Sequence, residues 1–138
     1  MGPSSVEFIE KASGIKTRYL IDKKNSLDTN VMKPILSQEN PGKVSILAEM
    51  SIHAAKEALD QAGIEAKDVD AVILGTSHTS RNYPAIACEV MDELGIEGYG
   101  YDMLIGCSST TFAISNAYSD IASGLADTVL VVNPELTS

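Results

Sequence analysis

The sequence predicts a layered α/β fold, in which a sheet carries helices on both sides. Three observations support this prediction. Residues 71–75 and 128–132 are short, wholly apolar runs, as in strands that are buried on both faces. Segments with helical spacing of apolar residues lie between such runs. A glycine follows each of these segments, at the position where helices commonly end: Gly63, Gly95 and Gly124.

The first 43 residues are less regular. Residues 5–12 predict a short helix with three apolar residues toward one side: Val6, Phe8 and Ile9. Apolar and polar residues alternate enough over residues 15–21 to predict a strand. Residues 22–43 are polar and contain prolines and a glycine, so we expect a long surface excursion there.

Ser45 is a typical N-cap for a helix over residues 45–62. The apolar residues of this helix recur at a spacing of about 3.6 residues and predict its buried stripe: Leu47, Met50, Ala54, Ala55, Ala58, Leu59 and Ala62. A strand at 71–75 follows. Pro84 then fits the first turn of a helix that runs to Leu94.

Residues 99–105 predict a third strand. Residues 108–123 predict a helix whose side chains are small and apolar on nearly all sides. A helix without a polar face is usually buried, so we expect this one to be central. The strand 128–132 completes a β-α-β-α-β order. The chain stops directly after it, and we therefore expect residues 1–138 to form a single partial domain rather than a finished one.

Composition narrows the class of protein. The chain has 44% hydrophobic and 21% charged residues, which is ordinary for a soluble domain. Its 10 basic and 19 acidic residues give a net charge of −9, which argues against a nucleic-acid surface. No apolar run approaches the roughly 20 residues that span a bilayer. Two cysteines without a secretory signal predict free thiols and a cytoplasmic location.

Cys107 is the candidate reactive residue, because it lies between an apolar strand and the central helix. A helix N-terminus stabilises a thiolate, and its N–H groups can bind the oxyanion that forms when a thiolate attacks a thioester. Gly106 permits a tight turn and leaves room for a substrate carbonyl. The alternatives are an inert buried Cys107 or a disulfide with Cys88. Cys88 falls inside the helix 84–94, where core packing is expected.

The ordered motifs of nearly the whole chain resemble β-ketoacyl-acyl-carrier-protein synthase III, of the thiolase superfamily. They are Gly14-Ile15-Lys16-Thr17-Arg18, residues 55–64, residues 70–76, Tyr83-Pro84-Ala85-Ile86-Ala87-Cys88, Leu94-Gly95-Ile96, Asp102, Cys107-Ser108-Ser109, Ser123-Gly124 and Leu130-Val131-Val132. The resemblance implies the N-terminal half of a thiolase-like layered fold, with a mixed sheet and helices on both faces.

The resemblance also implies roles for individual residues. Cys107 matches the nucleophile that takes an acyl group from a thioester, with Gly106 and Ser108 beside it at the substrate. Tyr83 matches a position, usually aromatic, that crosses a homodimer interface and lines the partner's acyl pocket. A plain loop or core aromatic is the alternative for Tyr83.

A coenzyme A site is implied more weakly. Family members that use acyl-coenzyme A often carry a Trp and an Arg in the stretch matching residues 8–12, where this chain has Phe8 and Ala12. Phe8 can still stack on an adenine, and Lys11 can meet a phosphate. A core Phe and a solvated Lys are the alternatives.

The family's catalytic His and Asn lie in a C-terminal half that this sequence does not match. His53 and His78 fit neither position. The implied reaction is acyl transfer to Cys107 and decarboxylative condensation with malonyl-carrier-protein, in fatty-acid synthesis. Acyl carrier protein, acyl-coenzyme A and the C-terminal half are the implied partners, with no cofactor and no metal. We expect the 138-residue chain alone to be inactive in condensation.

Several segments look like the β-ketodecanoyl synthase branch, which extends a medium-chain starter: 22–43, 83–87, 107–109 and 131–135. Two other readings stay open. One is a different thiolase-fold enzyme, such as a thiolase or a hydroxymethylglutaryl-CoA-synthase-like protein. The other is a non-catalytic module that pairs with another chain.

Overall fold

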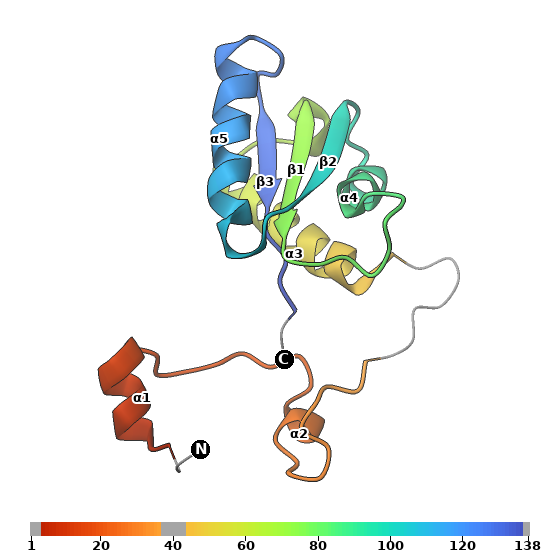
Figure 1. The fold of residues 1–138 in the computed structure, drawn as a ribbon. Coiled ribbons are helices and arrows are strands. Elements are labelled where there is room, and N and C mark those ends of the chain that lie inside the picture. The colour runs from red at the N-terminus through yellow and green to blue at the C-terminus, as the bar shows by residue number, and fades with distance from the viewer. Residues whose placement is uncertain (1–3, 37–43, 137–138) are drawn as a thin grey trace. The chain divides into compact units, whose positions relative to one another are not determined.

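The computed structural model describes residues 4–36 and 44–136 (Figure 1). By its internal contacts the chain separates into two units, one reaching residue 38 and the other beginning at residue 39. The single partial domain 1–138 with a surface excursion at 22–43 stays a prediction, and residues 37–43 of that segment lie outside the described residues.

The first unit contains two helices, α1 (Val6–Ser13) and α2 (Lys23–Ser26). Ser5 caps α1 by accepting a hydrogen bond from the Phe8 N–H. The strand predicted at 15–21 is wrong, because residues 15–20 have no regular structure and pair with no strand in the described part of the chain. Tyr19 is 96% exposed. Alternation alone does not make a strand when no neighbour accepts its backbone hydrogen bonds.

The second unit is built on three parallel strands, β1 (Ala71–Thr76), β2 (Tyr99–Leu104) and β3 (Val129–Val132). Their spatial order is β2-β1-β3, so β1 is central (Figure 1). Every residue of β1 is buried, as its apolar sequence predicts. The described strands all run parallel, and no antiparallel pair of the expected mixed sheet occurs among them.

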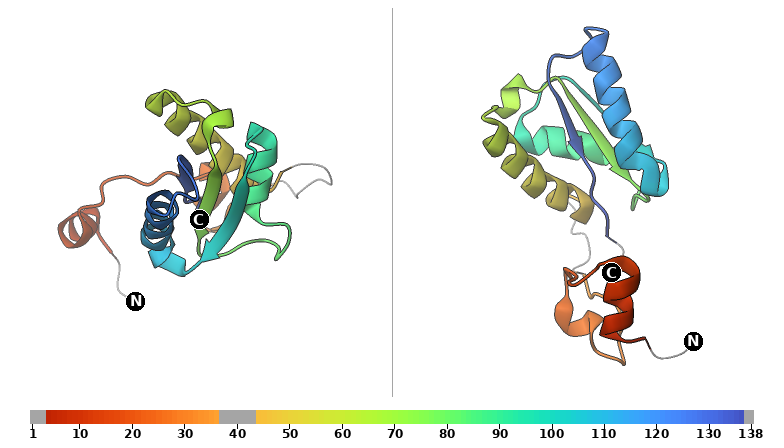
Figure 2. Two further views of the ribbon diagram at one scale, coloured as in Figure 1. Left: turned by 90° about the horizontal axis from the view of Figure 1, so that it is seen from above. Right: turned by 90° about the vertical axis from the view of Figure 1, so that its left-hand side faces the viewer.

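Helices cover both faces of this sheet, as predicted. α3 (Ile46–Ala62) and α4 (Ile86–Leu94) pack on one face, and α5 (Ser109–Ala122) packs on the other (Figure 2). Alternate residues of β1 serve the two sides: Val72 and Leu74 join the α3 and α4 core, and Ile73 packs with α5. Two short 3₁₀ turns, η1 (Ala66–Asp68) and η2 (Gly106–Ser108), precede β1 and α5.

α3 begins and ends where the sequence predicts, with Ser45 as N-cap and Gly63 in the left-handed conformation after it. The buried stripe differs in part from the prediction. Its members are Leu47, Ala48, Ser51, Ile52, Ala55 and Leu59. Ala54, Ala58 and Ala62 face solvent instead. His53 is exposed.

α4 begins at Ile86, so Pro84 precedes the helix rather than occupying its first turn. The carboxylate of Asp102 on β2 accepts hydrogen bonds from the N–H groups of Ile86 and Ala87, at 2.7 and 2.9 Å. The core packing predicted for Cys88 is wrong, since its side chain is exposed. The sheet-facing side of α4 is made by other residues: Ile86, Ala87, Val90 and Met91.

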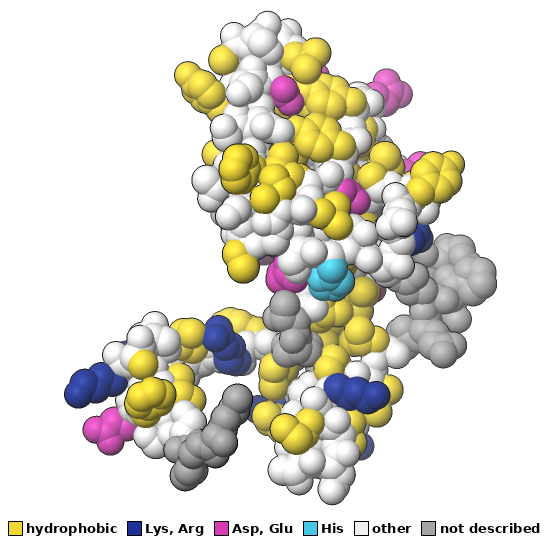
Figure 3. Space-filling view, viewed as in Figure 1, with side chains coloured by type: hydrophobic (Ala, Val, Ile, Leu, Met, Phe, Trp, Pro, Cys, Tyr) yellow, Lys and Arg dark blue, Asp and Glu magenta, His cyan; other side chains and the backbone are white. Residues whose placement is uncertain are grey.

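α5 is buried on one side only, which corrects the expectation of a helix buried all round. Ser109, Ala113 and Ala117 face the sheet. The opposite side exposes large apolar residues: Phe112, Ile114, Tyr118 and Ile121. Figure 3 shows apolar side chains at the surface of the second unit. The sheet contacts only the residues of α5 that point at it, and among the described residues of the second unit the core on this face contains no residue of the opposite side of α5.

Candidate active site

Cys107 lies in the 3₁₀ turn η2, between the end of β2 and the start of α5. Its side chain is exposed and its thiol is free, which excludes both the inert buried cysteine and the disulfide with Cys88 in this structure. Gly106 has a φ of 62°, a left-handed conformation that favours glycine. The sequence prediction that Gly106 allows a tight turn is therefore confirmed.

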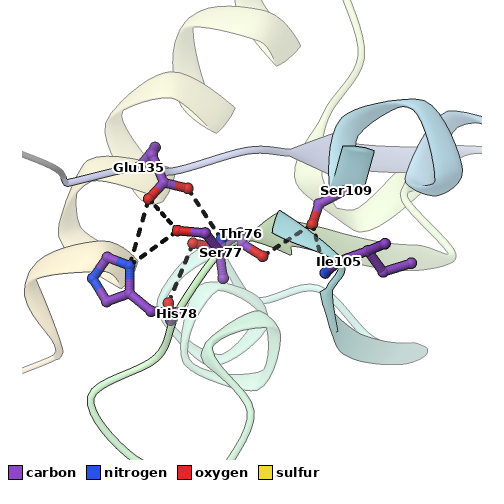
Figure 4. A network of polar contacts seen from close by, with 6 residues as sticks. All are labelled: Thr76, Ser77, His78, Ile105, Ser109 and Glu135. Atoms are coloured by element: carbon purple, nitrogen blue, oxygen red, sulfur yellow. Dashed lines mark hydrogen bonds and ion pairs between the residues drawn. The ribbon is translucent and has the colours of Figure 1, made fainter. Parts of the chain in front are cut away.

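The buried hydroxyl of Ser109 fixes the turn that carries Cys107. Its Oγ accepts a hydrogen bond from the Ile105 N–H at 2.9 Å and donates one to the Thr76 carbonyl at 2.9 Å (Figure 4). Ile105 begins the turn, and Thr76 ends β1. Ser109 thereby ties the Cys107 turn to the central strand. The Ser109 N–H donates to the Gly106 carbonyl. The N–H groups that follow it at the start of α5 carry the positive end of the helix dipole, next to Cys107.

A pocket of about 280 Å³ opens at the carboxyl ends of the strands, where open parallel sheets usually hold ligands. Cys107 and Gly106 lie in its wall. The other lining residues come from the ends of β1 and β3 and the start of α5: Gly75, Thr76, Ser77, Ser109, Thr110, Asn133, Pro134 and Glu135. The exposed thiol of Cys107 is thus accessible to a small ligand that enters this pocket.

The floor of this pocket is tightly packed. A side chain at Gly75 would lie 2.5 Å from Asn133 Oδ1 and 3.0 Å from Ser109 Cβ. Glycine is the residue that permits this approach between the ends of β1 and β3 and the start of α5.

A polar cluster joins the ends of β1 and β3 at the pocket wall (Figure 4). Glu135 accepts hydrogen bonds from the Ser77 N–H at 3.0 Å and from the Ser77 hydroxyl at 2.5 Å. His78 Nδ1 lies 3.4 Å from Glu135 Oε1 and 3.3 Å from Ser77 Oγ. The hydrogen bond from the Ser77 hydroxyl, above the other contacts, holds the pKa of Glu135 below its ordinary value of 4.5.

The structure brings together only part of the residues predicted from the sequence. Ser108 is the N-cap of α5 and is exposed beside Cys107, without lining the pocket. Tyr83 is 86% exposed in the segment before α4 and also does not line it. Phe8 and Lys11 lie on α1, in the first unit, and Phe8 is exposed there. His78 contacts Glu135 rather than Cys107.

Sequence reasoning assigned no site role to Gly75, Thr76, Ser77 or Glu135. A usable signal was present, since residues that follow apolar parallel strands meet at one edge of the sheet. Residues 75–77 and 133–135 follow two such runs. Among the described residues no cluster of His, Cys, Asp and Glu has the arrangement needed to hold a metal ion. In the same part of the chain, no helix has the length and hydropathy to cross a membrane.

Comparison with known proteins identifies the fold and the relatives. Residues 29–138 match the family described as "Thiolase, N-terminal domain". The β-ketodecanoyl-[acyl-carrier-protein] synthase of Pseudomonas aeruginosa is 50% identical over 136 residues, which are 99% of this chain and 39% of that enzyme. A β-ketoacyl-[acyl-carrier-protein] synthase III of Vibrio parahaemolyticus is 38% identical over 93 residues, covering 67% of this chain and 29% of that one.

Solved structures agree with the sequence relatives. The crystal structure of 3-oxoacyl-[acyl-carrier-protein] synthase III from Aquifex aeolicus matches 96% of this chain and 36% of that chain, with a TM-score of 0.70 and 31% identity. The chain spans 39% or less of the length of the two sequence relatives described above. This chain therefore belongs to the thiolase N-terminal domain family, and the relatives it resembles are β-ketoacyl-acyl-carrier-protein synthases, of which it matches a part.

Proposed function

We propose that this chain carries the acyl-accepting centre of a β-ketoacyl-acyl-carrier-protein synthase III-type enzyme of fatty-acid synthesis. One observation carries the proposal: Cys107 is an exposed free thiol in the wall of a pocket, at the start of a 14-residue helix. This setting suits a nucleophilic thiolate better than a structural cysteine.

The proposed first step is a thioester exchange. The thiolate of Cys107 attacks the carbonyl carbon of an acyl thioester, and a new C–S bond forms. The bond to the donor sulfur then breaks, and the leaving thiolate takes up a proton equivalent to the one that Cys107 lost. N–H groups at the start of α5 are suitable donors for the oxyanion that forms between these events.

The proposed second step is decarboxylative condensation with malonyl-carrier-protein to give a β-ketoacyl product. In the family this step uses a His and an Asn of a C-terminal half, which the present sequence does not match. We therefore propose that the step needs this second half, in an enzyme that is a homodimer with Tyr83 at the subunit interface. Acyl-coenzyme A or acyl carrier protein delivers the acyl group, without a further cofactor, in the cytoplasm.

A medium-chain acyl group is the proposed first substrate. The support is the 50% identity to an enzyme named for a β-ketodecanoyl product, whose acyl starter is two carbons shorter. An octanoyl thioester is therefore the probe of choice.

Acylation of the purified chain by octanoyl-coenzyme A tests the proposal, with intact-mass and peptide mass spectrometry as the measurement. We expect one octanoyl group on the Cys107 peptide. Cys107→Ala should abolish the adduct. Cys88→Ala should retain it, and is a matched control because Cys88 is the other exposed free thiol.

Adducts on Cys88 and Cys107 at equal rates would indicate unselective thiol chemistry and would contradict the proposal. An absent adduct, also after addition of a C-terminal half from a relative, would favour a non-catalytic pairing module. Condensation is assayed separately, by adding malonyl-carrier-protein. We expect no β-ketoacyl product from the chain alone, and a product would show that the second half is dispensable.

A further inference from the structure

We infer that Glu135 is a positioning residue for the acylation of Cys107. Its hydrogen bonds hold the end of β3 against the end of β1, and they thereby set the shape of the pocket that receives the acyl chain. This inference rests on the proposed function. It adds a residue outside the Cys107 turn and assigns it an effect on substrate selectivity.

The strand ladder stops before the pocket. β1 and β3 are paired from Ala71 and Val129 up to Leu74 and Val132. β1 continues beside β2 to Thr76, whereas the chain after Val132 leaves the ladder. The two hydrogen bonds from Ser77 to Glu135, at 3.0 and 2.5 Å, join the strand ends beyond that point. They hold together two segments that the backbone pairing no longer holds.

The tie at Glu135 connects directly to the Cys107 turn. Ser77 is bonded to Glu135, and the preceding residue, Thr76, accepts the hydrogen bond from Ser109. Ser109 in turn holds Ile105, at the beginning of the turn. Two consecutive residues at the end of β1 therefore link one pocket wall to the other. A shift of Glu135 changes the distance between the walls without removing a group from Cys107 itself.

Glu135 is suited to this role rather than to a purely structural one. Its side chain is 40% exposed, and it lies outside the apolar core. Its carboxylate accepts charge-assisted hydrogen bonds, which are stronger and more directional than neutral ones. His78 Nδ1 lies 3.4 Å from Oε1 of Glu135, which is the oxygen that accepts the hydrogen bond from the Ser77 hydroxyl.

The test compares acylation of the full 138-residue chain by octanoyl-coenzyme A and by acetyl-coenzyme A, with iodoacetamide as a small reagent for Cys107. The variants are Glu135→Ala, Glu135→Gln and Ser77→Ala. Glu93→Ala is the control, since Glu93 is an exposed carboxylate on α4 without a described partner. Thermal unfolding of each variant is recorded alongside.

We expect Glu135→Ala to lower the ratio of octanoyl to acetyl acylation rates by about tenfold, which is within the roughly 100-fold loss that a misplacement of about 1 Å can cause. Its iodoacetamide rate should be unchanged. Ser77→Ala should show a smaller loss, because the Ser77 N–H still binds Glu135. Glu135→Gln should restore most of the ratio, since its amide can accept from the Ser77 N–H and donate to the Ser77 hydroxyl.

An unchanged ratio in Glu135→Ala would overturn the inference. So would an equal slowing with all three reagents together with a lower unfolding temperature, because that pattern indicates a structural role. Failure of the wild-type chain to be acylated at Cys107 would instead contradict the proposed function, and the inference with it. Glu93→Ala should match wild type in every measurement.

Discussion

The hydroxyl of Ser109 and the carbonyl of Thr76 lie 2.9 Å apart and join the start of α5 to the end of β1. Ser109 is only 2% exposed, so this hydrogen bond is shielded from water. The same hydroxyl accepts the Ile105 N–H, and one buried oxygen thus satisfies two backbone groups. Ser109 thus ties the turn that carries Cys107 to the end of the central strand.

Ser109→Ala should lower the free energy of unfolding by roughly 1–3 kcal/mol, because it leaves a carbonyl and an N–H without partners. Urea unfolding measures the change. It should also slow octanoylation of Cys107 at a temperature where the variant remains folded. Ser115→Ala, on the exposed side of the same helix, is the control and should change neither quantity. Equal stability of the two variants would refute the structural role of Ser109.

Asp102→Ala should destabilise the chain by roughly 1–3 kcal/mol, because the N–H groups of Ile86 and Ala87 lose a charged acceptor at the start of α4. Asp102→Asn should cost less, since its one carbonyl oxygen can still accept. Guanidinium unfolding of both variants measures this order. Asp92→Ala, at an exposed position of the same helix, is the control. A larger cost for Asn than for Ala would contradict the capping role.

Asp70 predicts a pH dependence of stability. Its carboxylate accepts the N–H groups of Thr128 and Asp127 at 2.9 and 2.8 Å, and these hydrogen bonds, Thr128 first, lower its pKa from 3.8. A carboxyl whose pKa is lower in the folded state stabilises that state above its unfolded pKa, and this contribution disappears as the pH falls through the folded pKa.

The difference in free energy of unfolding between wild type and Asp70→Asn should therefore be constant near neutral pH. It should shrink as the pH falls below 3.8. Urea unfolding at a series of pH values measures the difference, which cancels the titration of the other carboxylates. A difference that grows toward acid would contradict this assignment.

Tyr99 should ionise only at strongly alkaline pH. Burial, followed by the hydrogen bond from its hydroxyl to Asp120 at 2.8 Å, raises its pKa to about 12. Ultraviolet absorbance of tyrosinate measures the titration, and Tyr99→Phe should remove a step near pH 12. Asp120→Asn should move that step to lower pH. Because the pKa of Tyr99 is raised in the folded state, Tyr99 contributes stability below its ordinary pKa of 10.0. This contribution is lost as the pH rises through about 12.

Much of the second unit could be predicted because its signals are local. The apolar runs at β1 and β3, the Ser45 cap and the glycine after α3 each determine an element within a few residues. The predicted strand at 15–21 failed because a strand exists only with a neighbour. The prediction of core packing for Cys88 failed because a position within a helix does not say which side of α4 faces the sheet.

The residues of the candidate site also differ in whether a local sequence pattern predicts them. Cys107 and Gly106 were found from a strand followed by a helix, which is a pattern of adjacent residues. Ser77 and Glu135 are separated by 58 residues, and their hydrogen bonds depend on β3 returning beside β1.

The sequence by itself determined the α/β class, the order of the elements of the second unit and the candidate cysteine, since each follows from residue patterns within one segment. Only the tertiary structure decided which strand ends form the pocket around Cys107. The physical reason is that the order β2-β1-β3 is set by the packing of helices on two faces of a sheet, and that packing brings the ends of β1 and β3 together.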